Sequence, residues 1–194
     1  IIRVGFALLT IGAVLLIPIV PRADSGVALL VPLLIGGSGL GLLVSQLNNY
    51  TLAPIDEEHV SEAAGVNSAA GSFGLSFGLA VAGAIMLAVL AIAFTQLSAS
   101  STVLSPDQQQ QVATALEKDA QIMSDAQVQE LVTDQPDATK AEILRINDES
   151  RQIALQVALL IPIIAGVLGF ANAFRMVRTP EPKPSAAAEG MLLG

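Results

Sequence analysis

The residues with the clearest capacity for chemistry surround His59, the single histidine of the chain. Glu58 and Glu62 fall on one helical turn with it, and carboxylate and imidazole groups together can bind a metal ion such as Zn²⁺. A metal site needs further ligands and an outer shell that orients them, whereas Asp56 and Glu57 beside it are typical of a hydrophilic connection. We therefore interpret His59 as a solvated residue and predict no metal site and no cofactor.

Other enzymatic chemistry has no support in the chain. Cysteine is absent, which excludes disulfides and thiolate metal sites. The sequence also contains no pairing of a nucleophile with a base, no phosphate-binding loop and no basic patch for nucleic acid. We expect a protein that is not an enzyme and has no nucleic-acid partner.

A second set of polar residues is uncharged and lies near the ends of two apolar runs, 26–45 and 69–94. Serine and asparagine in such runs can hydrogen-bond neighbouring helices, at about 0.6–2 kcal/mol each, or line a pathway for a solute. The runs 4–20 and 153–174 are chiefly aliphatic, so we expect them to face lipid and the first pair to face inward. The candidate pathway residues are Ser38, Gln46, Asn49, Asn67 and Ser72.

Small residues recur on one face of the run 69–94. Gly71, Gly74 and Gly78 follow Asn67 at spacings of four, three and four residues, which keeps all of them on one side of a helix. Gly37 and Gly41 repeat the same GxxxG spacing in the run 26–45. Such faces let two membrane helices approach closely. We assign these five glycines to helix packing, either static or as a smooth surface on which helices rock during transport.

The elements that carry these residues are four apolar runs, about 4–20, 26–45, 69–94 and 153–174. None contains Asp, Glu, Lys, Arg or His, and each is close to or above the length that spans a hydrocarbon core of about 30 Å as a helix. The whole chain is 53% hydrophobic and only 13% charged. The fold class is therefore all-α integral membrane protein, with a bilayer as its first partner.

Intramembrane carboxylates are the usual proton relays of transporters, and the four runs have none. The first run resembles a signal peptide only superficially, because it is too long and lacks a cleavage pattern. We expect this chain to be a piece of a longer protein whose remaining N-terminal helices pack against it.

A polar insert at 98–152 separates the third and fourth runs. It holds ten acidic residues and dominates the net charge of −8. Ser105 and Pro106 predict a helix start, Ser124 and Asp125 a second, and a third helix is expected from near Pro136 into the last run. The resulting domains are three transmembrane helices within 1–97, the helical insert 98–152, the last transmembrane helix 153–174 and a disordered tail 175–194.

Basic residues set the expected orientation, because cytoplasmic ends of membrane helices carry an excess of Lys and Arg. The count places both termini and the polar connection 53–64 in the cytoplasm and the acidic insert outside. The residues counted are Arg3, Arg175, Arg178 and Lys183 on the first side, and Arg22, Arg145 and Arg151 on the second.

The stretch GGSGLGLLVSQLNNYTLAPIDEEHVSEAAGVNSAAGSFGLSFGLAVAGAI, residues 36–85, resembles the late region of the drug:proton antiporter-2 family of the major facilitator superfamily. These proteins are fourteen-helix multidrug and antiseptic exporters. Their glycine-rich helix leads through a cytoplasmic connection to a second small-residue pattern, and a long external insert precedes the last helix. The residues that match the second pattern are Ala64, Gly65, Asn67, Gly74, Gly78 and Ala80.

The resemblance implies that this chain is about the last four helices of an exporter in the cell inner (plasma) membrane, where protons are exchanged for small amphipathic or cationic drugs. The family's proton-titrating carboxylates then belong to the missing helices. One departure is Gly71, which stands where many relatives have an arginine. Two other hypotheses remain: a membrane scaffold whose acidic insert binds a partner, and a facilitator for a hydrophilic solute.

Overall fold

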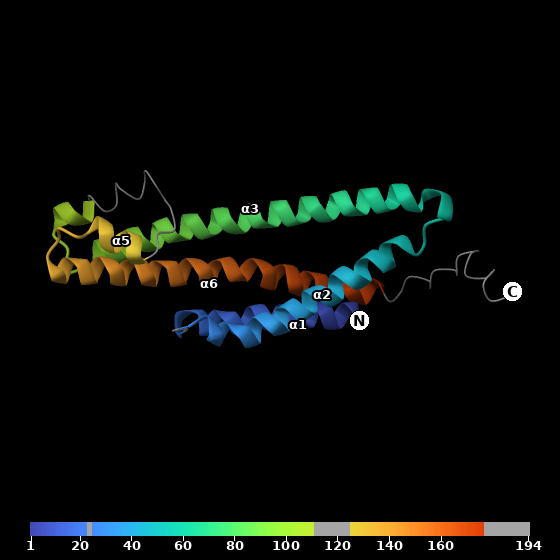
Figure 1. Ribbon diagram of the computed structural model, residues 1–194, viewed down its shortest axis with the longest axis horizontal. Coiled ribbons are helices and arrows are strands. Elements are labelled where there is room, and N and C mark those ends of the chain that lie inside the picture. The colour runs from blue at the N-terminus through green and yellow to red at the C-terminus, as the bar shows by residue number, and fades with distance from the viewer. Residues whose placement is uncertain (23–24, 111–124, 177–194) are drawn as a thin grey trace. The chain divides into compact units, whose positions relative to one another are not determined.

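The computed structural model describes residues 1–22, 25–110 and 125–176, and within these residues it is helical with no β-strand (Figure 1). A further helix begins at Pro106 and continues to the last described residue before the gap, Gln110. The other elements are α1 (Ile2–Ile19), η1 (Val20–Arg22), η2 (Gly26–Leu29), α2 (Leu30–Leu52), η3 (Glu57–His59), α3 (Val60–Ser100), α5 (Asp125–Leu131) and α6 (Asp137–Met176).

Four of these helical segments are long and apolar enough to cross a membrane, which confirms the all-α class and the number of candidate spans in the described chain. The helices extend past the predicted apolar runs. α3, for example, begins at Val60 within the expected polar connection 53–64. Backbone hydrogen bonding continues beyond the point where side chains become polar, so apolar composition marks the part of a helix suited to lipid and not the helix ends.

The chain forms two compact units. Helices α3 and α6 each begin in one unit and end in the other. Unit 1 comprises Ile1–Ile19, Ala23–Leu79 and Pro162–Gly194, and unit 2 comprises Val20–Arg22 and Ala80–Ile161. Unit 1 therefore contains α1, α2, the first half of α3 and the end of α6. Unit 2 contains the second half of α3, the described part of the insert and the beginning of α6.

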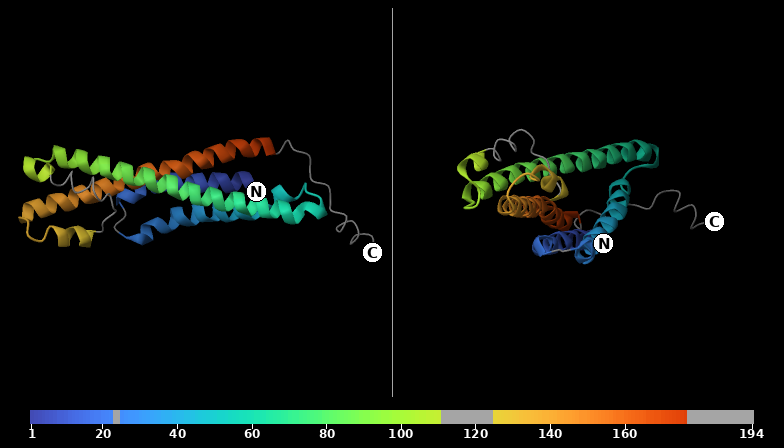
Figure 2. Two further views of the ribbon diagram at one scale, coloured as in Figure 1. Left: turned by 90° about the horizontal axis from the view of Figure 1, so that it is seen from above. Right: turned by 60° about the vertical axis from the view of Figure 1, so that its left-hand side comes forward.

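Within unit 1, α1 and α2 lie side by side and antiparallel (Figures 1 and 2). Their backbones approach so closely at Gly12 that a Cβ atom there would lie 2.6 Å from the backbone nitrogen of Gly36 and 2.8 Å from the carbonyl oxygen of Pro32. A Cβ atom at Gly39 would lie 2.5 Å from the backbone nitrogen of Leu9. Only glycine fits at these two positions.

The other side of α1 receives the end of α6. A Cβ atom at Gly166 would collide with the hydroxyl of Thr10, and one at Gly169 with the ring of Phe6. The Thr10 hydroxyl donates a hydrogen bond of 2.8 Å to the carbonyl of Phe6, so its polar group is satisfied within α1. Glycines on three helices thus pack α1 between α2 and α6, and we call these contacts the α1 seam.

Unit 2 has a small core where α3 ends and α6 begins. Phe94 of α3, Leu104 of the following turn and Ile146 of α6 are buried together, with Leu97 and Ile143 packed around them. Ile146 is fully buried. This core belongs to the base of the polar insert, because Leu104, Ile143 and Ile146 all lie within 98–152.

The helix starts predicted for the insert are largely confirmed. Ser105 and Gln108 form a capping box, in which each side chain bonds the other's backbone nitrogen at 3.4 and 3.0 Å. α5 begins at Asp125, while Ser124 lies outside the described residues. α6 begins at Asp137 and runs without interruption to Met176, so the third insert helix and the last apolar run are one helix.

The remainder of the insert, 111–124, and the predicted disordered tail from residue 177 lie outside the described residues. Residues 175 and 176, which the sequence assigns to that tail, are still part of α6.

Because of the α1 seam, we expect the effect of a glycine substitution on the free energy of unfolding to depend strongly on its position. Gly12→Ala should lower the free energy of unfolding by about 1–3 kcal/mol, because its methyl group would meet immovable backbone atoms of α2. Gly41→Ala, where nothing lies within 4 Å of the added carbon, should be neutral or slightly stabilising. Helix loss during denaturation of the purified chain in detergent checks this, and equal effects at both positions would contradict the seam.

Candidate functional site

The predicted pathway residues of α2 and α3 differ in exposure within unit 1. Ser38, Asn49 and Ser72 are exposed, whereas Gln46 and Asn67 are half-buried. The side-chain amide of Asn67 donates a hydrogen bond of 2.7 Å to the side-chain oxygen of Asn48. Their role in lining a pathway stays a prediction.

The Asn48–Asn67 bond is one of three contacts that connect helix ends within unit 1. The hydroxyl of Tyr50, near the end of α2, donates a hydrogen bond of 2.9 Å to the carbonyl of Met176, the last residue of α6. At the start of α1, the guanidinium carbon of Arg3 lies 4.2 Å from the centre of the Phe174 ring. We call these three contacts the end cluster.

The end cluster brings together segments that the sequence analysis expects on one side of the membrane. It joins the beginning of α1, the end of α2, the beginning of α3 and the end of α6. Each contact suits its place, because the last carbonyls of a helix have no partner within it and a hydroxyl such as that of Tyr50 can supply one. Arginine over an aromatic face gains cation–π attraction.

The glycines predicted to pack helices are open in the described chain. A Cβ atom at any of them would have nothing within 4 Å, and they are Gly37, Gly41, Gly71, Gly74 and Gly78. Their packing role stays a prediction, since it requires a helix that approaches them. The close contacts instead use glycines that the sequence analysis did not select, namely Gly5, Gly12, Gly39, Gly166 and Gly169.

The sequence held a signal for the seam. Gly5 and Gly12 are seven residues apart, which is about two turns and hence one face of α1. This spacing differs from the GxxxG pattern of close helix contacts, and the surrounding side chains are aliphatic, as on a helix that faces lipid. In unit 1, α1 is packed on two sides while residues 71–77 of α3 are exposed. In unit 1 the close approaches follow glycine positions and not polar residues. The division into two inward and two lipid-facing helices stays a prediction.

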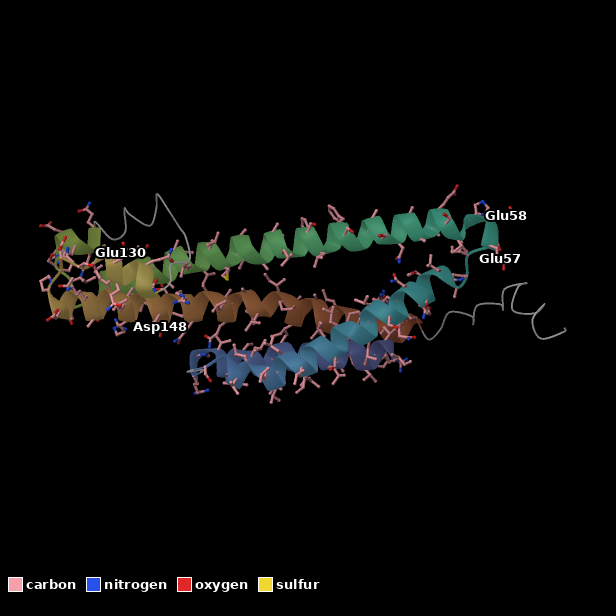
Figure 3. All side chains as sticks on the ribbon, viewed as in Figure 1. Glu57, Glu58, Glu130 and Asp148 are labelled. Atoms are coloured by element: carbon pink, nitrogen blue, oxygen red, sulfur yellow. The ribbon has the colours of Figure 1, made fainter. Side chains whose placement is uncertain are left out.

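The polar connection between α2 and α3 is exposed as expected. Figure 3 shows Glu57 and Glu58 at this turn, where they and His59 form η3. All three side chains are exposed.

The insert has a polar anchor at its base, centred on Glu142 of α6. Arg145 donates two hydrogen bonds to this carboxylate, of 2.9 Å from Nε and 3.0 Å from Nη2. Its Nη1 donates a hydrogen bond of 2.6 Å to the carboxylate of Glu149. The hydroxyl of Ser101, directly after α3, donates to the same carboxylate at 2.6 Å. The Ser101 oxygen accepts bonds from the backbone nitrogens of Val103 and Leu104. We call this group the Glu142 clamp.

The clamp fixes the chain as it leaves α3. Gln109 adds bonds from its side-chain amide to the carbonyls of Ser101 and Leu104 at 3.0 and 3.3 Å. Outside this group, acidic residues such as Glu130 of α5 and Asp148 of α6 are exposed (Figure 3). The insert thus has an ordered base and an acidic surface.

The clamp changes the acidity of Glu142, which lies in the polar part of α6 that precedes the apolar run 153–174. Its pKa falls from the ordinary value of 4.5 to about 2. The hydrogen bonds from Arg145 lower the pKa most, the Ser101 hydroxyl lowers it further, and partial burial opposes both. Glu142 therefore stays ionised at any physiological pH.

Comparison of the chain with protein-family models gives no match, and neither a curated protein nor a solved structure matches it. The contacts described above hold helices together. The α1 seam, the end cluster and the Glu142 clamp join segments far apart in sequence.

The Glu142 clamp predicts acid sensitivity at the base of the insert. A carboxylate with a lowered pKa stabilises the fold above its unfolded pKa, near 4.5, and this contribution disappears as the pH falls from there towards 2. Glu142→Gln should therefore be less stable than wild type at pH 7 and equally stable near pH 2. Thermal unfolding of both chains across this range checks the prediction, and a difference that is independent of pH would contradict it.

Proposed function

We propose that this chain is the C-terminal part of a secondary-active exporter that releases small amphipathic or cationic drugs in exchange for protons. The proposal places it in the drug:proton antiporter-2 family of the major facilitator superfamily, as the resemblance of residues 36–85 implies. Its partners are then the bilayer, the drug and protons, and the remaining N-terminal helices of the same protein. The proposed location is the cell inner membrane, with multiple spans and a cytoplasmic C-terminus.

The observation that carries the proposal is the open small-residue face on α3. In unit 1, Gly71, Gly74 and Gly78 follow Asn67 along one side of the helix, with nothing within 4 Å of an added Cβ atom. A helix of the missing part can approach this face closely and move along it, because no side chain protrudes. Movement of one helix group against another is the means by which secondary transporters alternate access.

Two further observations agree with the proposal. The four apolar helical segments suit a multispan membrane protein. The end cluster holds the beginning of α1, the end of α6 and the helix ends beside the α2–α3 connection at one end of unit 1, which agrees with four alternating crossings. The proposed energy source is the proton gradient.

A membrane scaffold is the second candidate, and the insert favours it. The Glu142 clamp and the buried Phe94–Ile146 core give the insert a defined base, while exposed Glu130, Asp134 and Asp148 present negative charge. Such a surface can hold a basic partner. The third candidate, a facilitator for a hydrophilic solute, has only the polar residues of α2 and α3 in its favour.

Gly78→Leu in the full-length protein tests the role of the open face. A leucine should leave the amount of folded protein nearly normal and reduce drug export per molecule, because the side chain obstructs a helix that must move past it. Gly78→Ala should be mild, since alanine keeps most of the close approach. Export of a fluorescent cation from cells, with and without a proton uncoupler, is the measurement.

Leu79→Ala, one residue along the same helix, is the control for a change of volume outside the small-residue face. If Gly78→Leu alters neither abundance nor export, the face has no partner and the proposal loses its main support. Export that persists after the proton gradient is removed would contradict proton coupling. Normal membrane assembly of a wild-type protein that transports nothing would favour the scaffold.

The proposed orientation has its own test, in which this chain adds no cysteine besides the introduced one. The test uses single cysteines in place of Thr102, in the insert, and of Glu58, in the α2–α3 connection, and both positions are exposed. A membrane-impermeant thiol reagent should label the cysteine at 102 in intact cells and the one at 58 only after the membrane is opened. Labelling of both from outside would contradict an odd number of crossings between them.

A further inference from the structure

We propose that Arg3, together with the aromatic pair Phe170 and Phe174, forms a binding site for an anionic phospholipid at the edge of unit 1. The guanidinium of Arg3 would bind the lipid phosphate, and the two rings would contact the beginning of the acyl chains. The site does not depend on transport, so this proposal and the proposed exporter function can be tested separately.

The Arg3 side chain is held against an aromatic ring. Its guanidinium lies over the Phe174 ring, 4.2 Å from the ring centre. The Nε atom is buried without a hydrogen-bond partner, while the residue as a whole is only half-buried. The ring thus holds the guanidinium in place. Its two terminal nitrogens form the planar fork that can bind phosphate with two hydrogen bonds.

Neither Arg3 nor its neighbour Arg175 forms an ion pair within the described residues. Among the described residues, ion pairs form at Lys140 and Arg145, and no carboxylate pairs with Arg3. Arg175, in the last turn of α6 and next to Phe174, is exposed and likewise has no carboxylate partner in the described chain. Two positive charges therefore lie at one end of unit 1, and neither forms an ion pair with a carboxylate of the described residues.

The aromatic rings beside Arg3 favour a lipid over a free anion as the ligand. Phe170 and Phe174 form an edge-to-face pair with ring centres 5.2 Å apart, and they remain 36% and 48% exposed. Phe170 lies one turn deeper in the apolar run than Phe174. A phosphate ion would use only the arginine, whereas a phospholipid also covers exposed aromatic surface directly beneath it. A ligand with an anionic head and an apolar body fits both features.

The test is binding of two lipids to the purified full chain in detergent. Retention of phosphatidylglycerol and phosphatidylcholine, titrated separately and counted by native mass spectrometry, gives the apparent affinities. Phosphatidylglycerol should bind more tightly. Arg3→Gln should weaken its binding about five-fold, which is the usual effect of one basic residue beside anionic lipid, and should leave phosphatidylcholine unchanged.

Matched variants separate the site from general effects. Arg22→Gln removes the same charge at the other end of the α1 segment and should not change phosphatidylglycerol binding. Phe174→Leu should weaken it, whereas Phe73→Leu should not, because Phe73 belongs to the exposed stacked pair Phe73–Phe77 on α3. Arg3→Lys keeps the charge but loses the fork, so an intermediate affinity is expected, and this variant replaces Arg3→Gln if the latter fails to fold.

Three results would overturn the proposal. The first is equal binding of phosphatidylglycerol to wild type and to the Arg3 variants. The second is an equal loss in Phe73→Leu and Phe174→Leu, which would indicate unspecific apolar contact. The third is displacement of phosphatidylglycerol by inorganic phosphate at matched concentration, which would make the arginine a site for the free ion.

Discussion

The contact between the backbones of α1 and α2 is the constraint on which unit 1 depends. In lipid there is little hydrophobic gain from pairing two helices, because the surrounding tails are as apolar as the side chains. Close packing must supply the attraction instead. Gly12 and Gly39 provide it by removing the atoms that would hold the backbones apart. The end of α6 then reaches α1 through Gly166 and Gly169, so one helix organises two others.

Polar interactions have a different task, and their positions follow from solvation. The polar contacts that join different helices lie at helix ends and at the base of the insert, where a broken bond can be replaced by water. In the end cluster, the hydrogen bond from Tyr50 to Met176 joins residues 126 apart in sequence, and Arg3 and Phe174 are farther apart still. The Glu142 clamp concentrates a carboxylate, a guanidinium and a hydroxyl at the turn after α3. Each contributes modestly, and together they fix which helix ends are neighbours.

The number and type of helices could be predicted because apolar length is a local property of the chain. The capping box at Ser105 and the start of α6 near Pro136 were predictable for the same reason. The packing partners could not be predicted. A glycine face such as that of Gly71, Gly74 and Gly78 indicates that another helix can approach closely, but not which helix does so. The approach at Gly12 depends on which α2 residue lies opposite. Tyr50 and Met176 could not be paired from sequence, because nothing local connects them.

Exposure has a different meaning on α3 than it would in water. Phe73, Leu75 and Leu79 are 68–69% exposed, but apolar side chains in contact with lipid carry no penalty and are no sign of a partner. Glycine is different, because it lowers helix stability by about 1 kcal/mol relative to alanine in water and adds nothing to a lipid-facing surface. Three glycines in eight residues, Gly71 to Gly78, are therefore harder to explain by lipid than by an approaching helix. The smooth side of α3, and not its large exposed side chains, is the surface where another helix has most to gain.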